Sequence, residues 1–191
     1  MNKAVFFDRD GTLNFDPGYL GEPEKVKLFD NVPEVLYNLK HRLGFKIIVI
    51  SNQSGVARGL ITENDVLAVN NRINQILNQQ GVEIDAFYFC PFHPKFNDAE
   101  QCKCRKPSPQ LVFKAAKDYQ IDLTLSYFAG DKSSDILCGK NAGTKTILMD
   151  YNKSETEINF LKKVGISPNF VAVNFLDVYN YISGDVQEDN F

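Results

Sequence analysis

The segment Lys3-Ala-Val-Phe-Phe-Asp-Arg-Asp-Gly-Thr-Leu-Asn14 decides how this chain is expected to fold. Its apolar run, residues 4–7, predicts a buried strand that ends at two carboxylates, Asp8 and Asp10. Alternate residues of a strand share a face, so both carboxylates are expected on one side, and Gly11 permits a tight turn after them. A plain strand followed by an Asp-Gly turn would explain the pattern equally well.

Two neighbouring carboxylates repel each other unless one is protonated, paired or bound to a cation. Such a pair suits phosphoryl transfer, in which Asp8 or Asp10 attacks phosphorus, the other moves a proton, and Mg²⁺ offsets the charge. The segment therefore predicts either a turn or a phosphoryl-transfer site, and the remaining chain has to decide between them.

The composition is that of one ordinary globular domain. The chain has 191 residues, of which 43% are hydrophobic and 24% are charged, with a formal net charge of -3. This charge provides no basic surface for nucleic acid, and no apolar run reaches the ~20 residues of a membrane helix. No signal peptide is recognisable, so we expect a monomeric protein in the cytoplasm with no nucleic-acid or membrane partner.

Strand patterns alternate with helix patterns along the chain, and this alternation predicts an α/β fold. Strands are expected at residues 4–7, 46–50, 84–89, 127–130, 146–149 and 170–173. Helices are expected at residues 32–43, 62–80, 108–119, 134–142 and 154–163, with a last one after Asn174. Such βαβ units form a doubly wound parallel sheet, whose sites collect at the carboxyl ends of the strands. We expect a single domain over residues 1–183, and a frayed acidic tail over residues 184–191.

Polar residues at two further positions suit phosphate binding. Ser51 follows the strand at 46–50, where its hydroxyl could bind a phosphoryl oxygen, although a serine in a turn is the plainer interpretation. Lys106 precedes a helix start at Ser108, where its charge could neutralise a phosphate or a carboxylate, although basic pairs such as Arg105-Lys106 are common on surfaces.

Two more acids follow the strand at 127–130. Asp131 stands at the strand end, where its oxygens would suit Mg²⁺. Asp135 lies one helical turn later, and could either hold a metal-bound water or cap the helix.

Three of the four cysteines cluster beside a histidine. Cys90, His93, Cys102 and Cys104 are the ligand set of a closed structural Zn²⁺ site, and in a reducing compartment such clustering favours metal over a disulfide. Reduced thiols in a flexible loop are the alternative. Cys138, inside a predicted helix, is expected in the core.

Taken in order, these motifs resemble the haloacid dehalogenase (HAD) superfamily of aspartate-nucleophile phosphotransferases. Asp8-Arg-Asp-Gly-Thr-Leu13 is similar to its first motif, Ser51 to the second, Lys106 to the third, and Gly130-Asp131 with Asp135 to the fourth. The resemblance implies a HAD-like, Rossmann-type sheet, and the short stretches between the motifs leave no room for a large cap domain.

Further segments narrow the resemblance to the family of heptose bisphosphate phosphatases and histidinol phosphatases. These segments are 52–59, Cys90-Pro-Phe-His-Pro94, and Cys102-Lys-Cys-Arg-Lys-Pro107. The family usually has its zinc histidine where this chain has Phe92, and His93 stands one place later. The segment 55–59 favours the heptose branch.

The resemblance also implies residue roles. Asp8 would be the nucleophile and Asp10 the general acid and base, while Ser51 and Lys106 would stabilise the phosphoryl group. Mg²⁺ would bind to Asp8, the carbonyl of Asp10, and Asp131. The positions that match sugar-phosphate contacts are Asp16, Pro17, Gly18, Tyr19, Ser51, Asn52, Gln53, Ser54, Arg105, Lys106 and Lys132.

The implied reaction is Mg²⁺-dependent hydrolysis of the 7-phosphate of a heptose 1,7-bisphosphate through an aspartyl-phosphate. Hydrolysis of histidinol phosphate or another small sugar phosphate is the nearest alternative. A phosphate-binding protein without turnover is the remote one, because such a protein needs no proton donor beside Asp8.

Overall fold

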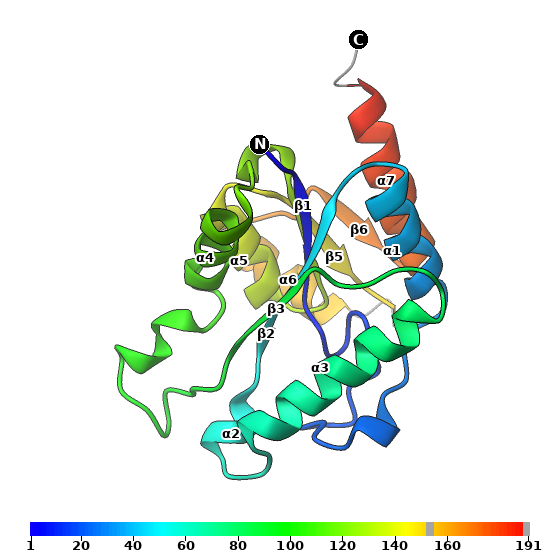
Figure 1. Ribbon diagram of the computed structural model, residues 1–191. Coiled ribbons are helices and arrows are strands. Elements are labelled where there is room, and N and C mark those ends of the chain that lie inside the picture. The colour runs from blue at the N-terminus through cyan, green and yellow to red at the C-terminus, as the bar shows by residue number, and fades with distance from the viewer. Residues whose placement is uncertain (152–154, 189–191) are drawn as a thin grey trace.

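The computed structural model describes residues 1–151 and 155–188, which form an α/β fold around one parallel sheet (Figure 1). The strands are β1 (Ala4–Phe7), β2 (Lys46–Asn52), β3 (Ala86–Cys90), β4 (Tyr127–Gly130), β5 (Lys145–Met149) and β6 (Phe170–Ala172). The α-helices are α1 (Val32–His41), α2 (Ser54–Ala57), α3 (Glu63–Asn78), α4 (Gln110–Tyr119), α5 (Ser133–Ala142), α6 (Glu155–Lys163) and α7 (Phe175–Glu188). Short 3₁₀ turns are η1 (Pro23–Lys25), η2 (Gln101–Cys104) and η3 (Leu123–Leu125).

The strand order places β1 in the middle of the sheet. The order is β3-β2-β1-β4-β5-β6, and all the pairings are parallel. The chain winds outward from β1 through β2 to β3, and then returns to the other side of β1 to start β4. Such a switch in winding direction opens a crevice at the carboxyl ends of the central strands, where ligands bind in open α/β sheets.

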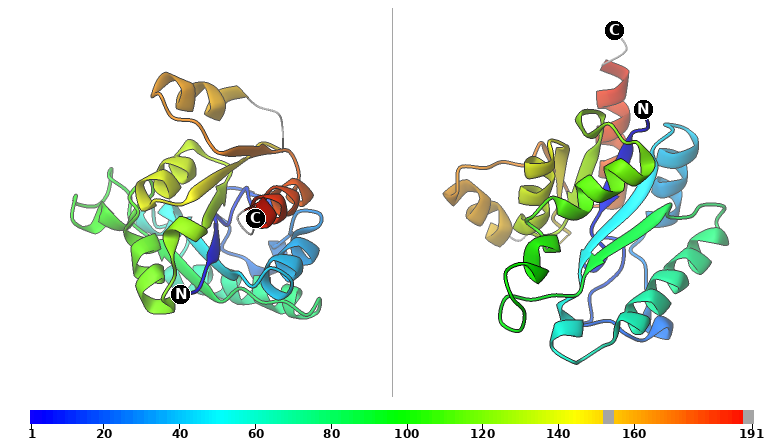
Figure 2. Two further views of the ribbon diagram at one scale, coloured as in Figure 1. Left: turned by 90° about the horizontal axis from the view of Figure 1, so that it is seen from above. Right: turned by 60° about the vertical axis from the view of Figure 1, so that its left-hand side comes forward.

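Alternation along the strands divides the core into two layers. Val5 and Phe7 pack with the helices α1, α3 and α7 on one face of the sheet, and Ala4 and Phe6 pack with α4 and α5 on the other. The helix α6 joins the second face through contacts of Leu161 with α5 and β5. The two views in Figure 2 show these helix layers on either side of the strands. The predicted doubly wound sheet is thus confirmed.

One helix has a start that the sequence encodes locally. Thr62 accepts a hydrogen bond from the backbone N–H of Asp65, whose carboxylate in turn accepts one from the N–H of Thr62, and this capping box precedes α3. On the buried side of α3, Val66, Val69, Ile73 and Leu77 repeat at helical spacing.

Residues 184–188, which we expected to belong to a frayed tail, are helical in the structure. These residues continue α7, because Val186 packs against the core and Asp185 forms an ion pair with Lys145. Residues 189–191 lie outside the described part, as does Ser154, the expected first residue of α6. The short helix α2 was not predicted, since four residues carry no periodic signal.

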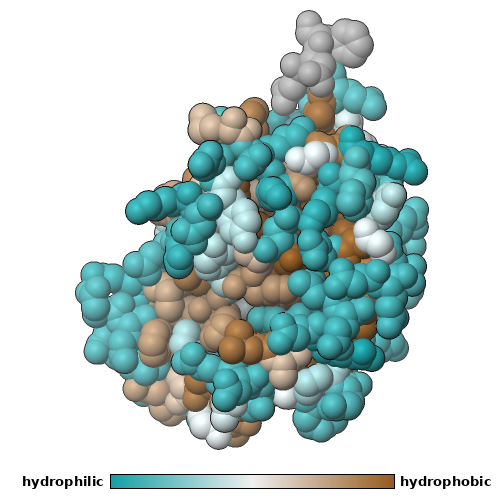
Figure 3. All heavy atoms as spheres, in the orientation of Figure 1, coloured by the Kyte–Doolittle hydropathy of each residue, from teal (hydrophilic) through white to brown (hydrophobic). Residues whose placement is uncertain are grey.

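Hydrophilic and hydrophobic side chains both occur on the molecular surface. The face shown in Figure 3 is mostly hydrophilic, with hydrophobic side chains between the polar ones, as on most protein surfaces. Among the described residues, none of the helices is long and apolar enough to cross a membrane.

Candidate active site

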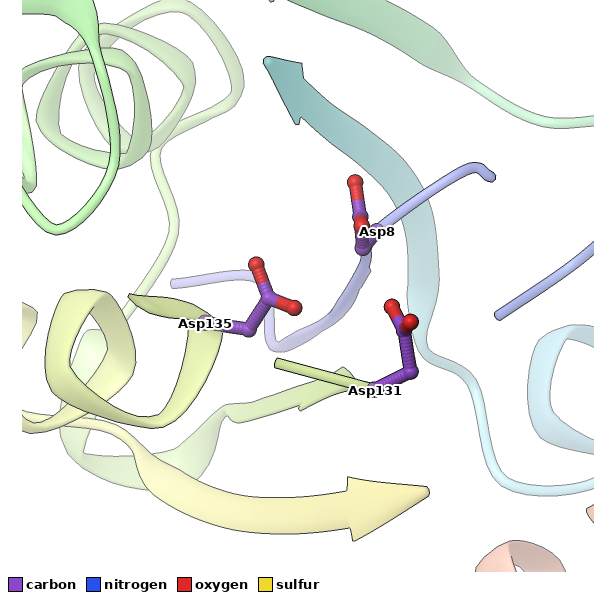
Figure 4. A group of neighbouring side chains, drawn as sticks. All are labelled: Asp8, Asp131 and Asp135. Atoms are coloured by element: carbon purple, nitrogen blue, oxygen red, sulfur yellow. The ribbon is translucent and has the colours of Figure 1, made fainter. Parts of the chain in front are cut away.

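Three aspartates meet where the central strands end. Asp8 follows β1 and Asp131 follows β4, and these neighbouring strands pair with Phe7 opposite Ala129. Asp135 projects toward both from the first turn of α5 (Figure 4). One oxygen of each carboxylate lies within 4.8 Å of the other two. In the described part of the chain, these three residues are the one group of His, Cys, Asp or Glu side chains close enough to share a metal ion.

Lys106 supplies a buried positive charge to this group. Its Nζ lies 2.7 Å from Oδ1 of Asp8, 2.7 Å from Oδ1 of Asp135, and 2.8 Å from the carbonyl oxygen of Ile50. Burial by itself would lower the pKa of Lys106, but the charges of Asp135 and Asp8 outweigh it and raise the pKa. Lys106 is therefore a fixed cation beside the predicted nucleophile, in agreement with the position expected from the sequence.

The three carboxylates carry more negative charge than Lys106 can balance. Burial and the charges of Asp8 and Asp135 raise the pKa of Asp131. Burial likewise raises the pKa of Asp135, against the opposing charge of Lys106. A hard divalent cation prefers carboxylate oxygens, so this donor set fits Mg²⁺. Asp8 and Asp131 belong to the group as predicted, and Asp135 joins them.

Asp135 also caps α5. Its Oδ2 accepts a hydrogen bond of 3.0 Å from the backbone N–H of Lys132, and its side chain is fully buried. The helix-capping interpretation is thus confirmed for one oxygen, and the other oxygen pairs with Lys106. That Asp135 also holds a metal-bound water stays a prediction.

The side chain of Asp10 has a separate environment from the three aspartates. It accepts hydrogen bonds from Arg9 at 2.8 Å, Asn14 at 2.9 Å and Gln53 at 2.9 Å. Burial raises the pKa of Asp10, but the charge of Arg9 and the hydrogen bonds outweigh it, so the pKa lies below its ordinary value. Asp10 and its neighbour Asp8 therefore have distinct environments, although they stand only two positions apart in the sequence.

Gly11 allows this loop to approach β4. Its φ of +84° is a conformation that favours glycine, and a Cβ atom there would lie 2.4 Å from Oδ2 of Asp131. The tight turn predicted at this residue is thus present, and it brings the backbone against the side chain of Asp131.

The end of β2 holds the loop that carries Lys106. The side-chain amide of Asn52 accepts a hydrogen bond from the N–H of Lys106 at 3.0 Å and donates one to its carbonyl at 3.2 Å. Ser51 is buried beside it, and its hydroxyl accepts a hydrogen bond from Gln53. Asn52, which we expected to contact substrate, therefore also holds the backbone of the predicted catalytic lysine.

A cavity of about 420 Å³ opens onto these residues. Its lining comprises Asp8, Asp10, Asp16, Gly18, Tyr19, Asn52, Gln53, Ser54, Gly55, Arg105, Lys106, Lys132, Ser134 and Asp135. Of the predicted substrate contacts, Pro17 and Ser51 are missing from this lining. Lys132 Nζ lies 4.0 Å from oxygens of both Asp16 and Asp131. The structure thus brings most of the predicted residues to one pocket.

The predicted zinc ligands are arranged differently from the expectation. Cys90 and Cys104 form a disulfide, with their Cα atoms 5.5 Å apart, and Cys102 is free. The expectation of metal in place of a disulfide is therefore not met. The physical reason is that two cysteines close enough to share a metal are also close enough to bond to each other. Cys138 is buried in the core, as predicted.

Sequence reasoning missed three residues around Asp10. Arg9 and Asn14 are fully buried, and Asn70 on α3 is 5% exposed. One signal could have pointed to Asn70, because it is a polar residue on the apolar face of the helix predicted at 62–80.

Comparison with known proteins places the chain among phosphatases. The family model described as polynucleotide kinase 3 phosphatase matches residues 3–171. The D-glycero-beta-D-manno-heptose-1,7-bisphosphate 7-phosphatase of Pasteurella multocida is 38% identical over 187 residues, which are 96% of this chain and 98% of that protein. The enzyme of the same name from Helicobacter pylori strain 26695 is 41% identical over 149 residues, which cover 78% and 83% of the two chains.

Two solved structures of phosphatases are also similar to this chain. The D,D-heptose 1,7-bisphosphate phosphatase of B. bronchiseptica, complexed with magnesium and phosphate, superposes with a TM-score of 0.81 at 25% identity, covering 96% of this chain and 99% of that one. A HAD-like phosphatase from Mesorhizobium loti gives a TM-score of 0.79 at 29% identity, over 95% and 86% of the two chains. The chain therefore belongs to the polynucleotide kinase 3 phosphatase family, and is a phosphatase of the HAD type.

Proposed function

We propose that this protein is a Mg²⁺-dependent phosphatase that hydrolyses the 7-phosphate of D-glycero-D-manno-heptose 1,7-bisphosphate. The observation that carries the proposal is a single pocket in which Asp8 and Lys106 lie beside two further cationic side chains, Arg105 and Lys132. The names of the relatives in Pasteurella and Helicobacter support the same substrate.

The reaction begins with attack by Asp8. An oxygen of Asp8 forms a bond to phosphorus while the bond from phosphorus to the sugar oxygen breaks. Asp10, which has to take up a proton before this step because its pKa is low, gives that proton to the sugar oxygen. Asp10 then takes a proton from water as the water attacks the aspartyl-phosphate and releases phosphate. Lys106 and the hydroxyl of Ser51 stabilise the charge on the phosphoryl oxygens.

Asp8 and Asp131 would hold Mg²⁺, together with the backbone carbonyl of Asp10 that the family resemblance implies. When bound, the ion would supply positive charge that neutralises phosphoryl oxygens next to Asp8. Asp135, which already pairs with Lys106, would complete the negative surroundings of the cation.

The distribution of positive charge favours a substrate with two anionic groups. Lys106 is buried and forms ion pairs with Asp8 and Asp135. Because it lies beside the nucleophile, its charge acts on the phosphate that reacts. Arg105 and Lys132 also line the cavity, and within the described part of the chain Arg105 forms no ion pair. A second phosphate on the same sugar would use this charge, whereas the amine of histidinol phosphate would be repelled by it.

Two measurements test the proposal. The Asp8→Asn variant should lose turnover with its fold intact, and Asp10→Asn should lose ~10²–10⁴-fold, the usual contribution of proton transfer. Release of phosphate from heptose 1,7-bisphosphate, histidinol phosphate and other sugar phosphates should then give the highest kcat/KM for the heptose. Substantial turnover by Asp8→Asn would overturn the covalent mechanism, and a preference for histidinol phosphate would overturn the substrate.

We also propose that the reduced protein holds a structural Zn²⁺ on Cys90, His93, Cys102 and Cys104. The proximity of Cys90 to Cys104 supports this, since both ions and disulfides require it. Elemental analysis of protein purified under reducing conditions should find one zinc per chain, and His93→Ala should lower that content. Absence of zinc together with two fewer titratable thiols would favour the disulfide. We also propose that the enzyme is monomeric and cytoplasmic, and a disulfide in the purified protein would argue against the cytoplasmic location.

A further inference from the structure

Arg9 is a fully buried charged residue for which the reaction described above has no use. Its neighbours Asp8 and Asp10 line the cavity, whereas Arg9 does not. Burying a guanidinium costs free energy unless all its donors are paired. The contacts of this side chain therefore show which groups it serves.

The guanidinium binds Asp10 along one edge. Nε lies 3.1 and 3.2 Å from the two oxygens of Asp10, and one NH2 nitrogen lies 2.8 Å from Oδ2. A forked contact of this kind fixes the plane of a carboxylate as well as its distance. The side chain of Asp10 is held further by Asn14 and Gln53.

Asn70 holds the opposite side of the same guanidinium. Its side-chain oxygen accepts a hydrogen bond of 2.9 Å from the NH1 nitrogen of Arg9, and Gln53 accepts one of 3.2 Å from NH2. Asn70 belongs to α3, and it is 5% exposed and absent from the cavity lining. Among the described residues, hydrogen bonds thus connect Asn70 to the cavity through Arg9 and Asp10.

We propose that Arg9 and Asn70 are positioning residues for proton transfer, in which Asn70 orients the guanidinium of Arg9 and Arg9 orients the carboxylate of Asp10. This inference rests on the proposed function, because the position of Asp10 matters for rate only if Asp10 moves a proton. Neither Arg9 nor Asn70 exchanges a proton itself. Their effect is to hold the oxygen that protonates the sugar and later receives a proton from water.

Substitution of Asn70 tests this arrangement more cleanly than substitution of Arg9. An uncharged residue at position 9 would leave the buried Asp10 without its cation and could prevent folding. Asn70→Leu keeps the branched shape and the number of side-chain heavy atoms, although leucine is the larger residue, and it removes the oxygen that accepts the hydrogen bond from Nη1 of Arg9. Asn71→Leu is the matched control, since Asn71 is the next residue of α3 and is exposed.

For Asn70→Leu we expect kcat to fall roughly 10- to 100-fold, because small displacements of a reacting group lower the rate by factors of this size. KM should change less than about twofold. Both variants are assayed with heptose 1,7-bisphosphate and Mg²⁺ well below their measured Tm, so that the whole population is folded. Asn71→Leu should match the unsubstituted protein. An unchanged kcat in Asn70→Leu would overturn the proposal.

A double-mutant cycle separates positioning from a general structural role. If Asn70 acts through Asp10, Asn70→Leu should have little further effect on the residual rate of the Asp10→Asn variant, measured by slow phosphate release. An equal fall in both backgrounds would mean that Asn70 supports the site without acting through Asp10, and would overturn the proposal.

A crystal structure of Asn70→Leu provides a test that needs no activity. We expect the guanidinium of Arg9 to rotate and the carboxylate of Asp10 to leave its present plane, whereas an unmoved carboxylate would contradict the inference. If Asp10→Asn proved as active as the unsubstituted protein, the proposed role of Asp10 in proton transfer would be refuted by that assay. The crystallographic result would still decide whether Asn70 positions Asp10.

Discussion

Lys106 Nζ lies 2.7 Å from Oδ1 of Asp8, so the predicted nucleophile is paired with a buried cation. The lysine comes from the loop before α4, and the aspartate from the end of β1. A side chain that pairs with Asp8 and is also to face the phosphoryl group of a substrate must lie at this point. The same ion pair links the stability of the fold to the chemistry of the site.

Replacement of Lys106 by methionine should lower both the stability of the fold and the phosphatase activity. Loss of one partner leaves Asp8 and Asp135 buried without their cation, and breaking such a pair costs about 3–5 kcal/mol of the free energy of unfolding. We expect a lower midpoint in urea denaturation and a large fall in kcat. Lys114→Met is the control, because its pair with Asp118 is exposed and should contribute little. A stable Lys106→Met variant with normal turnover would contradict the role assigned to this residue.

Mg²⁺ should stabilise the protein as well as activate it. The three carboxylates carry more charge than Lys106 balances, so a bound cation relieves repulsion in the folded state alone. Tm should therefore rise with Mg²⁺ concentration and fall back when EDTA is added, and phosphatase activity should follow. In Asp131→Asn the Tm of the metal-free protein should increase while its response to Mg²⁺ diminishes. A response to Mg²⁺ equal to that of the unsubstituted protein would remove Asp131 from the metal site.

Gly11 should be intolerant of a methyl group for two separable reasons. A Cβ atom would lie 2.4 Å from Oδ2 of Asp131, and the φ of +84° is strained for alanine. Gly44 has a φ of +73°, and apart from its chain neighbours no described residue would lie within 4 Å of an added methyl group there. Gly44→Ala therefore measures the strain alone, about 1–2 kcal/mol. We expect Gly11→Ala to lose more stability than Gly44→Ala and also to lose affinity for Mg²⁺. Equal losses in the two variants would show that the contact with Asp131 can relax.

The elements of the fold could be predicted because their signals are local. The residues of β1 form an apolar run, the capping box of Thr62 and Asp65 is four residues long, and Asp8 and Asp131 directly follow strands. The carboxyl ends of parallel strands share one edge, so Asp8 and Asp131 could be placed together without knowing a distance.

The contacts between distant segments could not be predicted. The pairing of Arg9 with Asn70, and of Asn52 with the backbone of Lys106, depends on how α3 and the loop before α4 pack on the sheet. Spacing in the sequence carries no information on such packing. The cysteines show the same limit, since proximity of Cys90 and Cys104 suits a metal or a disulfide equally.

The charge of Arg105 should determine the choice of substrate. Arg105 lines the cavity and donates one hydrogen bond to the carbonyl of Phe92, which leaves other donors of its guanidinium for a second phosphate. Because this residue does not contact Asp8, Arg105→Gln should raise KM for heptose 1,7-bisphosphate while kcat changes little. Hydrolysis of a heptose 7-phosphate, which lacks the second phosphate, should be almost unaffected. The ratio of kcat/KM for the two substrates reports this effect independently of the fraction of protein that is folded. An equal loss on both substrates would show that Arg105 serves the reacting phosphate, and the argument for a bisphosphate substrate from the charge of this pocket would then fail.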